Sequence, residues 1–435
     1  MAANNQIKSG RLSKAEVEEN FSDLHPPLTR SEALIEADRC YFCYDAPCVT
    51  ACPTGIDIPG FIQGIRSDNL RGSAHTILRE NIMGGMCARV CPTEILCEEA
   101  CVRNSHEEKP VEIGLLQRHA TDPIFESGEQ LFERAAASGK KIAIVGGGPA
   151  GLSCAHRLAV LGHDIVVFNR DDKLGGLNEY GIAAYKAIDD FAQTEVDYIL
   201  SIGGIEVRNN SALGSEVELA ELVENYDAVF LGVGLANSNA LGIDGEDLDG
   251  VENAIEYIAD LRQADDMSTL PVGRNVIVIG GGMTAIDVAV QSKRLGAEQV
   301  NMVYRRGPEK MSASVFEQAL AQTSGVNIHH WASPARIVGD GHVTGIEFKL
   351  EDNDEAMHLN ADVVFKAIGQ KLDGSGLDAL ASESGRFVVD ADQKTSVQGI
   401  WAGGDCVVGG DDLTVSAVQH GKIAAISIDQ YLRNS

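Results

Sequence analysis

The pattern of hydrophobic and polar positions changes near residue 140. Before it, apolar residues are scattered, which predicts short helices rather than one large core. After it, short apolar strands such as 141–145 alternate with glycine turns and helical stretches, a pattern typical of a parallel α/β sheet. A second strand–glycine–helix unit begins at 275–279, and an apolar strand at 228–233 lies between the two. The sequence therefore predicts a helical region followed by two similar α/β units.

The order of these segments predicts that the second α/β unit is inserted into the first. A third glycine cluster at 399–405 is followed by a helix expected over about 413–432, which returns the chain to the first unit. We therefore expect four segments, namely 1–138 (helical), 139–237 (the beginning of the first unit), 238–372 (the inserted unit) and 373–435 (the completion of the first unit).

Composition narrows the class of protein. The formal net charge is −29, which argues against a nucleic-acid partner, because phosphate binding needs clustered Lys and Arg. The polar, charged stretch 1–30 lacks the apolar segment of a signal peptide. No uncharged apolar run reaches the roughly 18 residues that a membrane span needs. We expect a cytoplasmic protein with no membrane segment.

Eight of the ten cysteines fall between Cys40 and Cys101, in two groups. The groups are Cys40, Cys43, Cys48 and Cys52, then Cys87, Cys91, Cys97 and Cys101, with Pro53 and Pro92 beside them. Thiolates so closely spaced are typical of ferredoxin-type ligands, so we predict two [4Fe–4S] clusters. Structural zinc is the alternative, although it prefers two separated Cys-x2-Cys pairs and only Cys40–Cys43 has that spacing. Disulfides are disfavoured, because no export signal is present.

The first glycine cluster has the form of a dinucleotide-binding loop. It reads Gly146-Gly-Gly148-Pro-Ala150-Gly151 directly after an apolar strand and opens a helix. Glycines let a pyrophosphate approach backbone amides at the positive helix N-terminus. The acid expected about 20 residues later, which would hold ribose hydroxyls, is replaced by Asn169. We predict an FAD site that includes Asn169.

The second cluster predicts a nicotinamide dinucleotide site. Gly280 and Gly282 are followed by Met283, Thr284 and Ala285, and alanine is a permitted third position of the fingerprint. The next strand ends in Arg305 and Arg306, a pair able to grip a 2′-phosphate, which favours NADPH over NADH. The alternative is that these arginines are solvated surface charges.

The third cluster ends in Gly404 and Asp405 after a short strand, and this arrangement commonly places the aspartate beside the ribityl chain of FAD. The alternative is an ordinary turn. Cys154 and Cys406 each stand alone and are interpreted as buried structural cysteines.

Together these motifs make the whole chain similar to the flavoprotein subunit of bacterial dihydropyrimidine dehydrogenase and, more distantly, to the small subunit of glutamate synthase. The resemblance rests on the cysteine groups, the three glycine clusters, the stretch Gly175-Gly-Leu-Asn-Glu-Tyr-Gly181-Ile182, and Gln117 within Ile113–Asp122. Glutamine at 117 looks like the dihydropyrimidine dehydrogenase version, whereas the glutamate synthase version looks to have glutamate. The alternative for Gln117 is a surface helix glutamine.

The resemblance implies an α/β protein with a helical N-terminal iron–sulfur domain and two Rossmann-like domains, the NAD(P) domain inserted into the FAD domain. It assigns cluster one to Cys40, Cys43, Cys48 and Cys101, cluster two to Cys52, Cys91, Cys97 and Gln117, and further FAD contacts to Gly176, Leu177, Thr414 and Ala417. Cys87 is then spare. The resemblance also implies NAD(P)H as substrate and a separate partner subunit with FMN and iron–sulfur clusters, because no pyrimidine-reducing barrel fits in this chain.

Three other functions would share features of this pattern. A glutamate synthase small subunit would use the same electron-input machinery, with Gln117 as the discriminating residue. A thioredoxin- or glutathione-type disulfide reductase would need a cysteine pair beside the flavin, and no cysteine lies between Cys154 and Cys406. A redox-sensing or scaffold protein would not need an intact nicotinamide site.

Overall fold

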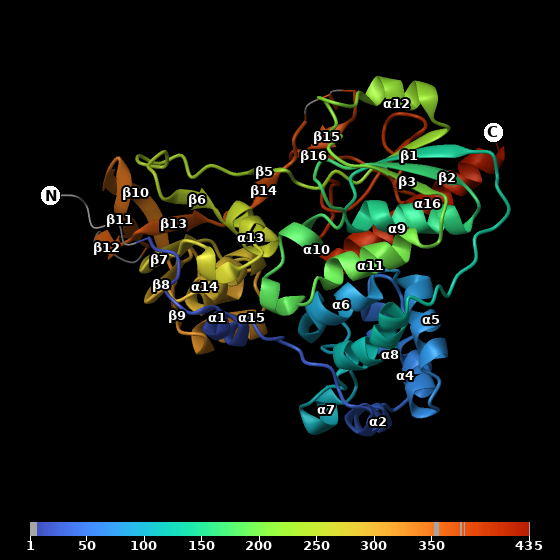
Figure 1. Cartoon of the computed structure of the whole chain (residues 1–435), viewed down its shortest axis with the longest axis horizontal. Helices are drawn as coiled ribbons and strands as arrows, with labels where there is room; N and C mark the ends of the chain where they lie inside the picture. Colours follow the sequence, from blue (N-terminus) through green and yellow to red (C-terminus); the bar gives the residue numbers. More distant parts are fainter. Residues whose placement is uncertain (1–6, 352–355, 375, 378, 435) are drawn as a thin grey trace. The chain divides into compact units, whose positions relative to one another are not determined.

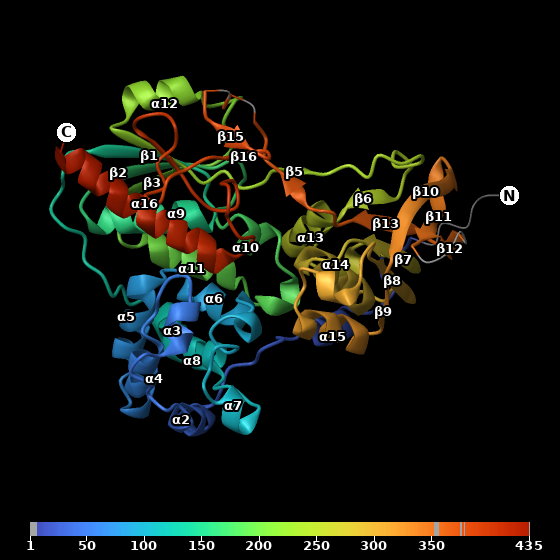
Figure 2. The same ribbon diagram turned by 180° about the vertical axis from the view of Figure 1, so that it is seen from behind.

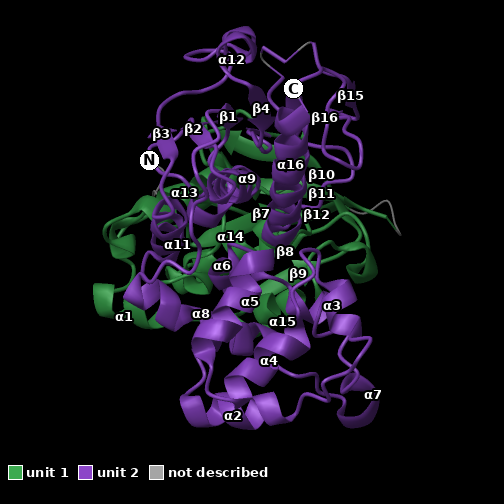
Figure 3. Ribbon diagram, turned by 90° about the vertical axis from the view of Figure 1, so that its right-hand side faces the viewer, with its two compact units in different colours: residues 1–24, 180–188, 238–370 green, residues 25–179, 189–237, 371–435 purple. Residues whose placement is uncertain are grey.

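A computed structural model of the chain describes residues 7–351, 356–374, 376–377 and 379–434. It divides into two compact units, which Figure 3 colours separately. Unit 1 contains residues 1–24, 180–188 and 238–370, and unit 2 contains residues 25–179, 189–237 and 371–435. The chain passes from one unit to the other through the short strands β5 (Asn237–Ser238) and β14 (Gln370–Lys371), among other crossings.

A five-stranded parallel sheet lies at the centre of unit 2 (Figures 1 and 2). Its strands, in spatial order, are β17 (Ile400–Ala402), β4 (Ala228–Leu231), β1 (Lys141–Val145), β2 (Asp164–Phe168) and β3 (Ile205–Arg208). β1 and β4 are almost continuously apolar, as expected for strands of a parallel sheet that is covered on both faces. β17 pairs with β4, so the segment that follows the insertion completes the sheet.

Two helices that are far apart in the sequence pack together beside this sheet. They are α9 (Pro149–Val160) and α16 (Thr414–Asn434). Gly421 allows their close approach, because a Cβ atom there would lie 2.1 Å from the Ala150 carbonyl oxygen. The other elements of this region are α10 (Leu177–Tyr180), α11 (Phe191–Leu200), α12 (Leu219–Asn225), β15 (Ser382–Glu383) and β16 (Arg386–Phe387).

The cysteine-rich region of unit 2 is helical. Its elements are α2 (Arg30–Asp38), α3 (Pro47–Ala51), α4 (Ile58–Arg66), α5 (Leu70–Glu80), α6 (Gly84–Val90), η1 (Thr93–Ile95), α7 (Asn104–Glu107) and α8 (Ile113–Ser127). α4 is strongly amphipathic and buries Phe61, Ile62 and Ile65. These residues share one apolar core with Ile77 of α5 and Leu116 of α8. The cysteines are therefore attached to a packed helical scaffold.

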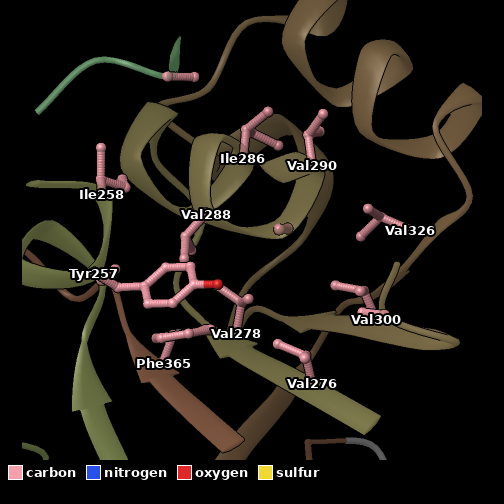
Figure 4. Packing of buried hydrophobic residues seen from close by; sticks show 14 of the residues in the cluster. Tyr257, Ile258, Val276, Val278, Ile286, Val288, Val290, Val300, Val326 and Phe365 are labelled. Atoms are coloured by element: carbon pink, nitrogen blue, oxygen red, sulfur yellow. The ribbon is translucent and has the colours of Figure 1, made fainter. Parts of the chain in front are cut away.

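Unit 1 contains a second five-stranded parallel sheet, with β6 (Val251–Asn253), β13 (Val363–Lys366), β7 (Asn275–Ile279), β8 (Gln299–Val303) and β9 (Val326–His329) in spatial order. Three antiparallel strands form a separate sheet, namely β10 (Ala332–Asp340), β11 (His342–Leu350) and β12 (Ala356–Asn360). The helices are α1 (Lys14–Asn20), η2 (Ala184–Lys186), α13 (Ala254–Gln263), η3 (Met267–Thr269), α14 (Met283–Arg294), η4 (Pro308–Lys310) and α15 (Val315–Thr323). Figure 4 shows the core between α14 and the parallel sheet, where Val276, Val278, Ile286 and Val288 meet Phe365.

The predicted fold class is confirmed, with a helical N-terminal region and two Rossmann-like sheets. The strand predicted at 275–279 is β7, the one at 228–233 ends two residues earlier as β4, and the final helix begins at Thr414. The four domain boundaries stay a prediction, and residues 1–24 cluster with unit 1 rather than with the cysteine-rich helices. Among the helices that the structure describes, none has the length and apolar character needed to cross a membrane.

Candidate flavin, nicotinamide and iron–sulfur sites

The first glycine loop joins β1 to α9 and depends on glycine for its geometry. Gly146 has φ of +102°, and a Cβ atom there would lie 2.2 Å from the Gly232 carbonyl oxygen. A Cβ atom at Gly151 would lie 1.9 Å from the Gly146 carbonyl oxygen. Both positions therefore exclude any side chain.

The middle of the same loop is open instead of crowded. A Cβ atom at Gly148 would meet nothing closer than the Gly176 Cα atom, at 3.8 Å. Gly148 is also the N-cap of α9, and no side chain caps that helix. The first backbone N–H groups of α9 are therefore available to an anion. This cradle fits the pyrophosphate of FAD, with Gly146, Gly148, Ala150, Gly151 and Gly176 around it.

Asn169 lies directly after β2 and organises the glycine loop. Its side chain is buried, and Oδ1 accepts a hydrogen bond from the Gly147 N–H at 3.2 Å. Its Nδ2 group donates to the carbonyl oxygens of Asp171 at 2.8 Å and Lys173 at 2.9 Å. The structure thus gives Asn169 a role in shaping the loop, and its contact with a ribose stays a prediction.

The end of β17 supplies the other side of the predicted flavin site. Gly404 has φ of +92°, and its backbone N–H donates to His420 Nδ1 at 3.1 Å. Burial, with a smaller contribution from the Asp412 carboxylate, raises the pKa of Asp405. Thr414, the first residue of α16, donates its hydroxyl to Asn178 Oδ1 at 2.7 Å. The predicted residues Gly404, Asp405, Thr414 and Ala417 therefore belong to one strand-to-helix connection.

The second glycine loop, between β7 and α14, repeats this geometry in unit 1. Gly280 has φ of +149°, and a Cβ atom there would lie 2.1 Å from the Ala367 carbonyl oxygen. Gly282 caps α14 without any side-chain hydrogen bond, while Met283 and Thr284 in the first turn are half-buried and Ala285 is buried. The uncapped amides of this turn fit a dinucleotide pyrophosphate.

Arg305 and Arg306 follow β8. The glycine loop follows the parallel neighbour β7, so both lie at the carboxyl ends of the strands. Both side chains are exposed, and within the described residues neither forms an ion pair. Sequence reasoning missed Tyr304, whose ring packs over the loop, since a Cβ atom at Gly281 would lie 2.5 Å from it. An exposed guanidinium pair beside a dinucleotide loop can bind a phosphate, and this role stays a prediction.

The first set of predicted ligands lies around one cavity. Cys40, Cys43, Cys48 and Cys101 all line it, together with apolar side chains such as Ile58 and Ile62. Burial and the neighbouring Cys40 and Cys101 thiols raise the pKa of Cys48 to about 12. An iron–sulfur cluster would supply the cations that favour the thiolate forms of these cysteines.

The second set surrounds the end of α6. Burial raises the pKa of Cys91 and Cys97 well above the ordinary range, and the nearby Cys52 thiol contributes to both shifts. Gln117 on α8 is buried, so it is not a surface glutamine, and its Nε2 group donates to the Gly84 carbonyl oxygen at 2.7 Å. Cys87 is also buried and influences the pKa of Cys91. The structure thus brings Cys52, Cys91, Cys97 and Cys87 together, with Gln117 against the first turn of α6.

Among the residues that the structure describes, no three His, Cys, Asp or Glu side chains surround a point that would suit a single metal ion. Cubane ligands differ from such a site, because each thiolate binds a different iron atom. The lone cysteines Cys154 and Cys406 are both fully buried, as predicted.

Three residues that sequence reasoning missed contact the cysteine-rich region from other elements of unit 2. Asn178 Nδ2 lies 4.0 Å from the sulfur atom of Met83, the N-cap of α6, so Asn178 contacts both Thr414 and Met83. Lys422 of α16 donates to the Thr54 carbonyl oxygen at 2.8 Å, close to Cys52. Only Asn178, which lies inside the conspicuous stretch 175–182, carried a signal in the sequence.

Glu195 of α11 is the third of these residues, and it fixes the start of α6. Its Oε1 atom accepts the backbone N–H groups of Gly85 at 2.8 Å and Met86 at 3.1 Å. Burial raises the pKa of Glu195 to about 8, although these two hydrogen bonds and the Arg89 guanidinium oppose the shift. The carboxyl group is therefore a buried helix cap with a pKa of about 8, close to neutral pH.

Comparison with known proteins finds two families that match this chain. The family described as pyridine nucleotide-disulphide oxidoreductase matches residues 140–421, and the family described as dihydropyrimidine dehydrogenase domain II, 4Fe-4S cluster, matches residues 17–129. Thioredoxin reductase from T. acidophilum superposes with a TM-score of 0.55 at 22% identity, covering 68% of this chain and 99% of that chain, which shows a shared fold.

Two full-length relatives have the same degree of similarity. The NAD-dependent dihydropyrimidine dehydrogenase subunit PreT of Salmonella typhimurium is 34% identical over 96% of this chain and 99% of its own length. The small chain of NADPH glutamate synthase from Escherichia coli is 34% identical over 95% of this chain and 94% of its own length. The chain is an NAD(P)H-dependent flavin and iron–sulfur oxidoreductase that belongs to the pyridine nucleotide-disulphide oxidoreductase family, in the group that carries a dihydropyrimidine dehydrogenase-type 4Fe-4S domain.

Proposed function

We propose that the chain is the electron-input subunit of a dihydropyrimidine dehydrogenase. It would oxidise NAD(P)H at FAD and pass electrons through two [4Fe–4S] clusters to a partner subunit that contains FMN and iron–sulfur clusters. The partner would reduce uracil or thymine to the 5,6-dihydro base, in a reversible reaction. The observation that carries the proposal is that the FAD cradle and both cysteine groups belong to one compact unit.

When bound, FAD would accept a hydride from the nicotinamide and release electrons singly, and the clusters would relay them. The chain's own residues supply binding and position. The open loop around Gly148 and the uncapped start of α9 would hold the flavin diphosphate, and Asp405 would bind the ribityl chain. The loop from Gly280 to Ala285 holds the nicotinamide dinucleotide on the matching turn of α14.

The iron–sulfur ligands follow the resemblance. Cys40, Cys43, Cys48 and Cys101 would hold the first cluster, which is supported by their common cavity. Cys52, Cys91, Cys97 and Gln117 would hold the second, which is supported by the effect of the Cys52 thiol on the pKa of both Cys91 and Cys97 and by the burial of Gln117.

The connection from flavin site to second cluster supports electron transfer within unit 2. Asn178 joins the start of α16 to Met83, which precedes α6, and Cys91 is the C-cap of that helix. Lys422 joins the same helix α16 to the backbone two residues after Cys52. These contacts fix the flavin side and the cluster side to each other, so that a bound donor and acceptor would keep a constant separation.

Glutamate synthase is the second candidate, because its small chain is as similar to this chain as PreT is. The same machinery would then serve a glutamine-dependent partner. Glutamine at position 117 favours the pyrimidine enzyme. The two relatives also differ in the cofactor that their names give, NAD for PreT and NADPH for glutamate synthase, so the role of Arg305 and Arg306 bears on the choice.

The test is an anaerobic pull-down of the tagged chain from its native cell. The eluate would be assayed for NADH- and NADPH-dependent uracil reduction, and the co-purifying chains identified. An FMN-containing partner with uracil-reducing activity supports the proposal. A large amidotransferase partner, or activity only with 2-oxoglutarate and glutamine, would replace it with the glutamate synthase role.

A further inference from the structure

A single charged residue lines the cavity that the first cysteine group surrounds. Arg103 lines the same cavity as Cys40, Cys43, Cys48 and Cys101, and every other described residue around that cavity is apolar, cysteine or tyrosine. Its position two residues after Cys101 gave no reason in the sequence to expect this, because neighbouring side chains can point in different directions.

The guanidinium of Arg103 is held in place from three sides. Nε donates to the Arg39 carbonyl oxygen at 2.5 Å, and the Cζ atom lies 3.8 Å from the centre of the Tyr41 ring. Glu107 forms an ion pair with it on the outer side. The side chain is 14% exposed, whereas that of Glu107 is 41% exposed. The positive charge is therefore fixed and shielded from water, while its counter-charge is more open to solvent.

Other charges nearby do not line the cavity. Arg39 is paired with Glu36 and Glu107, so those side chains largely neutralise one another. Arg66, whose side chain is 39% exposed, pairs with Asp38 and lies over the Phe42 ring. Arg103 is thus the one charged residue among the described residues that line this cavity.

Reduction of a [4Fe–4S] cluster adds one electron and hence one negative charge to a site that is already anionic. A fixed cation at short range in a poorly solvated cavity stabilises the reduced form more than the oxidised form. Net charge and solvent exposure are among the factors that set cluster potentials.

We propose that Arg103 raises the reduction potential of the cluster held by Cys40, Cys43, Cys48 and Cys101, so that electrons collect there before the partner takes them. Oxidation of one NAD(P)H supplies two electrons and releases one proton, and this cluster stores one of the electrons at a time. The inference rests on the proposed function, because it requires two clusters and an external acceptor. Arg103 would act only through the reduction potential of the cluster, and it would not contact the substrate.

The test measures the reduction potentials of the clusters and not the rate of turnover. Wild type, Arg103→Gln, Arg103→Lys and Glu107→Gln would be purified anaerobically, assayed for iron and sulfide, and titrated redox-potentiometrically with detection by electron paramagnetic resonance. Arg66→Gln is the matched control, because it removes an arginine from the same helical region without altering the cavity lining.

In Arg103→Gln we expect one of the two cluster signals to become at least tenfold harder to reduce, a shift of about 59 mV to lower potential for a one-electron couple. Arg103→Lys keeps the charge and should stay near wild type. Glu107→Gln removes the opposing charge and should shift the same signal upward, which a merely structural role would not produce. Arg66→Gln should leave both signals in place.

An unchanged potential in Arg103→Gln with full iron content would overturn the inference, as would equal shifts of both signals. If Arg103→Gln loses iron, Glu107→Gln decides, and a downward or absent shift there refutes the idea. Failure of the proposed function looks different, because the wild type would then show fewer than two clusters or would lack a uracil-reducing partner.

Discussion

Replacing Lys186 by methionine should destabilise unit 1 strongly and locally. Lys186 lies in the segment 180–188, and its Nζ atom is 2.7 Å from a carboxylate oxygen of Asp287 and 2.7 Å from one of Glu317. The three side chains are 8%, 6% and 10% exposed. Burial lowers the pKa of Lys186, but the two carboxylates outweigh this effect and raise it above its ordinary value. The lysine therefore stays charged in the folded protein.

The magnitude follows from what the substitution leaves behind. Methionine fills most of the space but leaves two buried carboxylates with no cation between them. Removal of one partner from a buried ion pair costs about 3–5 kcal/mol, because the remaining charge is neither hydrated nor paired. We expect the local free energy of unfolding of α14 and the segment 180–188 to fall by an amount in this range. We also expect a weaker affinity for NAD(P)H, because Asp287 lies on α14 two residues after Ala285 of the dinucleotide loop.

Hydrogen exchange followed by mass spectrometry suits this test, because it reports local stability in a protein of several domains. A loss of about 3 kcal/mol corresponds to more than a hundredfold faster exchange, at about 1.4 kcal/mol per factor of ten. Lys14→Met is the control, since the Lys14–Glu18 pair on α1 is exposed and 4.0 Å apart. The triple variant Lys186→Met, Asp287→Asn, Glu317→Gln should recover most of the protection against hydrogen exchange, because it removes the two unpaired carboxylate charges. The reasoning is refuted if Lys186→Met exchanges like Lys14→Met, or if the triple variant is no better than the single one.

Three further outcomes are expected. Gly148→Ala has room within the protein, because its Cβ atom would lie 3.8 Å from the nearest neighbour, so it should fold but lose most bound flavin, measured as absorbance per chain. Gly374→Ala, whose Cβ atom would meet no atom within 4 Å, should keep the flavin. Replacing Arg305 and Arg306 by alanine should lower kcat/KM for NADPH tenfold or more and leave NADH unchanged, and equal losses for both would contradict a 2′-phosphate site. Glu195 has a pKa of about 8 in the folded protein, above its value in the unfolded chain. Between pH 4.5 and 8 the folded protein therefore binds one more proton than the unfolded chain. The free energy of unfolding then falls as the pH rises, by about 1.4 kcal/mol per pH unit. Glu195→Gln should remove this slope in anaerobic urea unfolding, and an unaltered slope would show that another group is responsible.

The two glycine loops could be read from the sequence because their chemistry is local. A strand, a tight turn and a helix N-terminus occupy about a dozen consecutive residues, although the closest contacts of Gly146 and Gly280 are made with Gly232 and Ala367, which follow the neighbouring strands β4 and β13. The apolar runs at 141–145 and 275–279 likewise fixed the two central strands. The order of strand, turn and helix could therefore be recognised without knowledge of distant segments.

The connections between these regions could not be read in the same way. Glu195 caps a helix more than a hundred positions earlier in the chain, and Lys422 binds a carbonyl oxygen 368 positions away. Each looks in the sequence like an ordinary charged residue on an amphipathic helix. Burial and partners decide their roles, and both are properties of the tertiary packing.

Gln117 and Cys87 illustrate the same limit at the second cluster. Spacing alone groups Cys87 with Cys91 and Cys97, whereas the resemblance leaves it spare and brings in Gln117. In the structure both side chains are buried beside α6, with Gln117 bonded to the Gly84 carbonyl oxygen at the start of the helix and Cys87 in its middle. Glu195 binds the N–H groups of the same first turn, so the turn is held from two sides. A helix fixed in this way limits how far either candidate ligand can move, and the choice between a soft thiolate and an amide oxygen therefore depends on the position of α6 as well as on the ligands themselves.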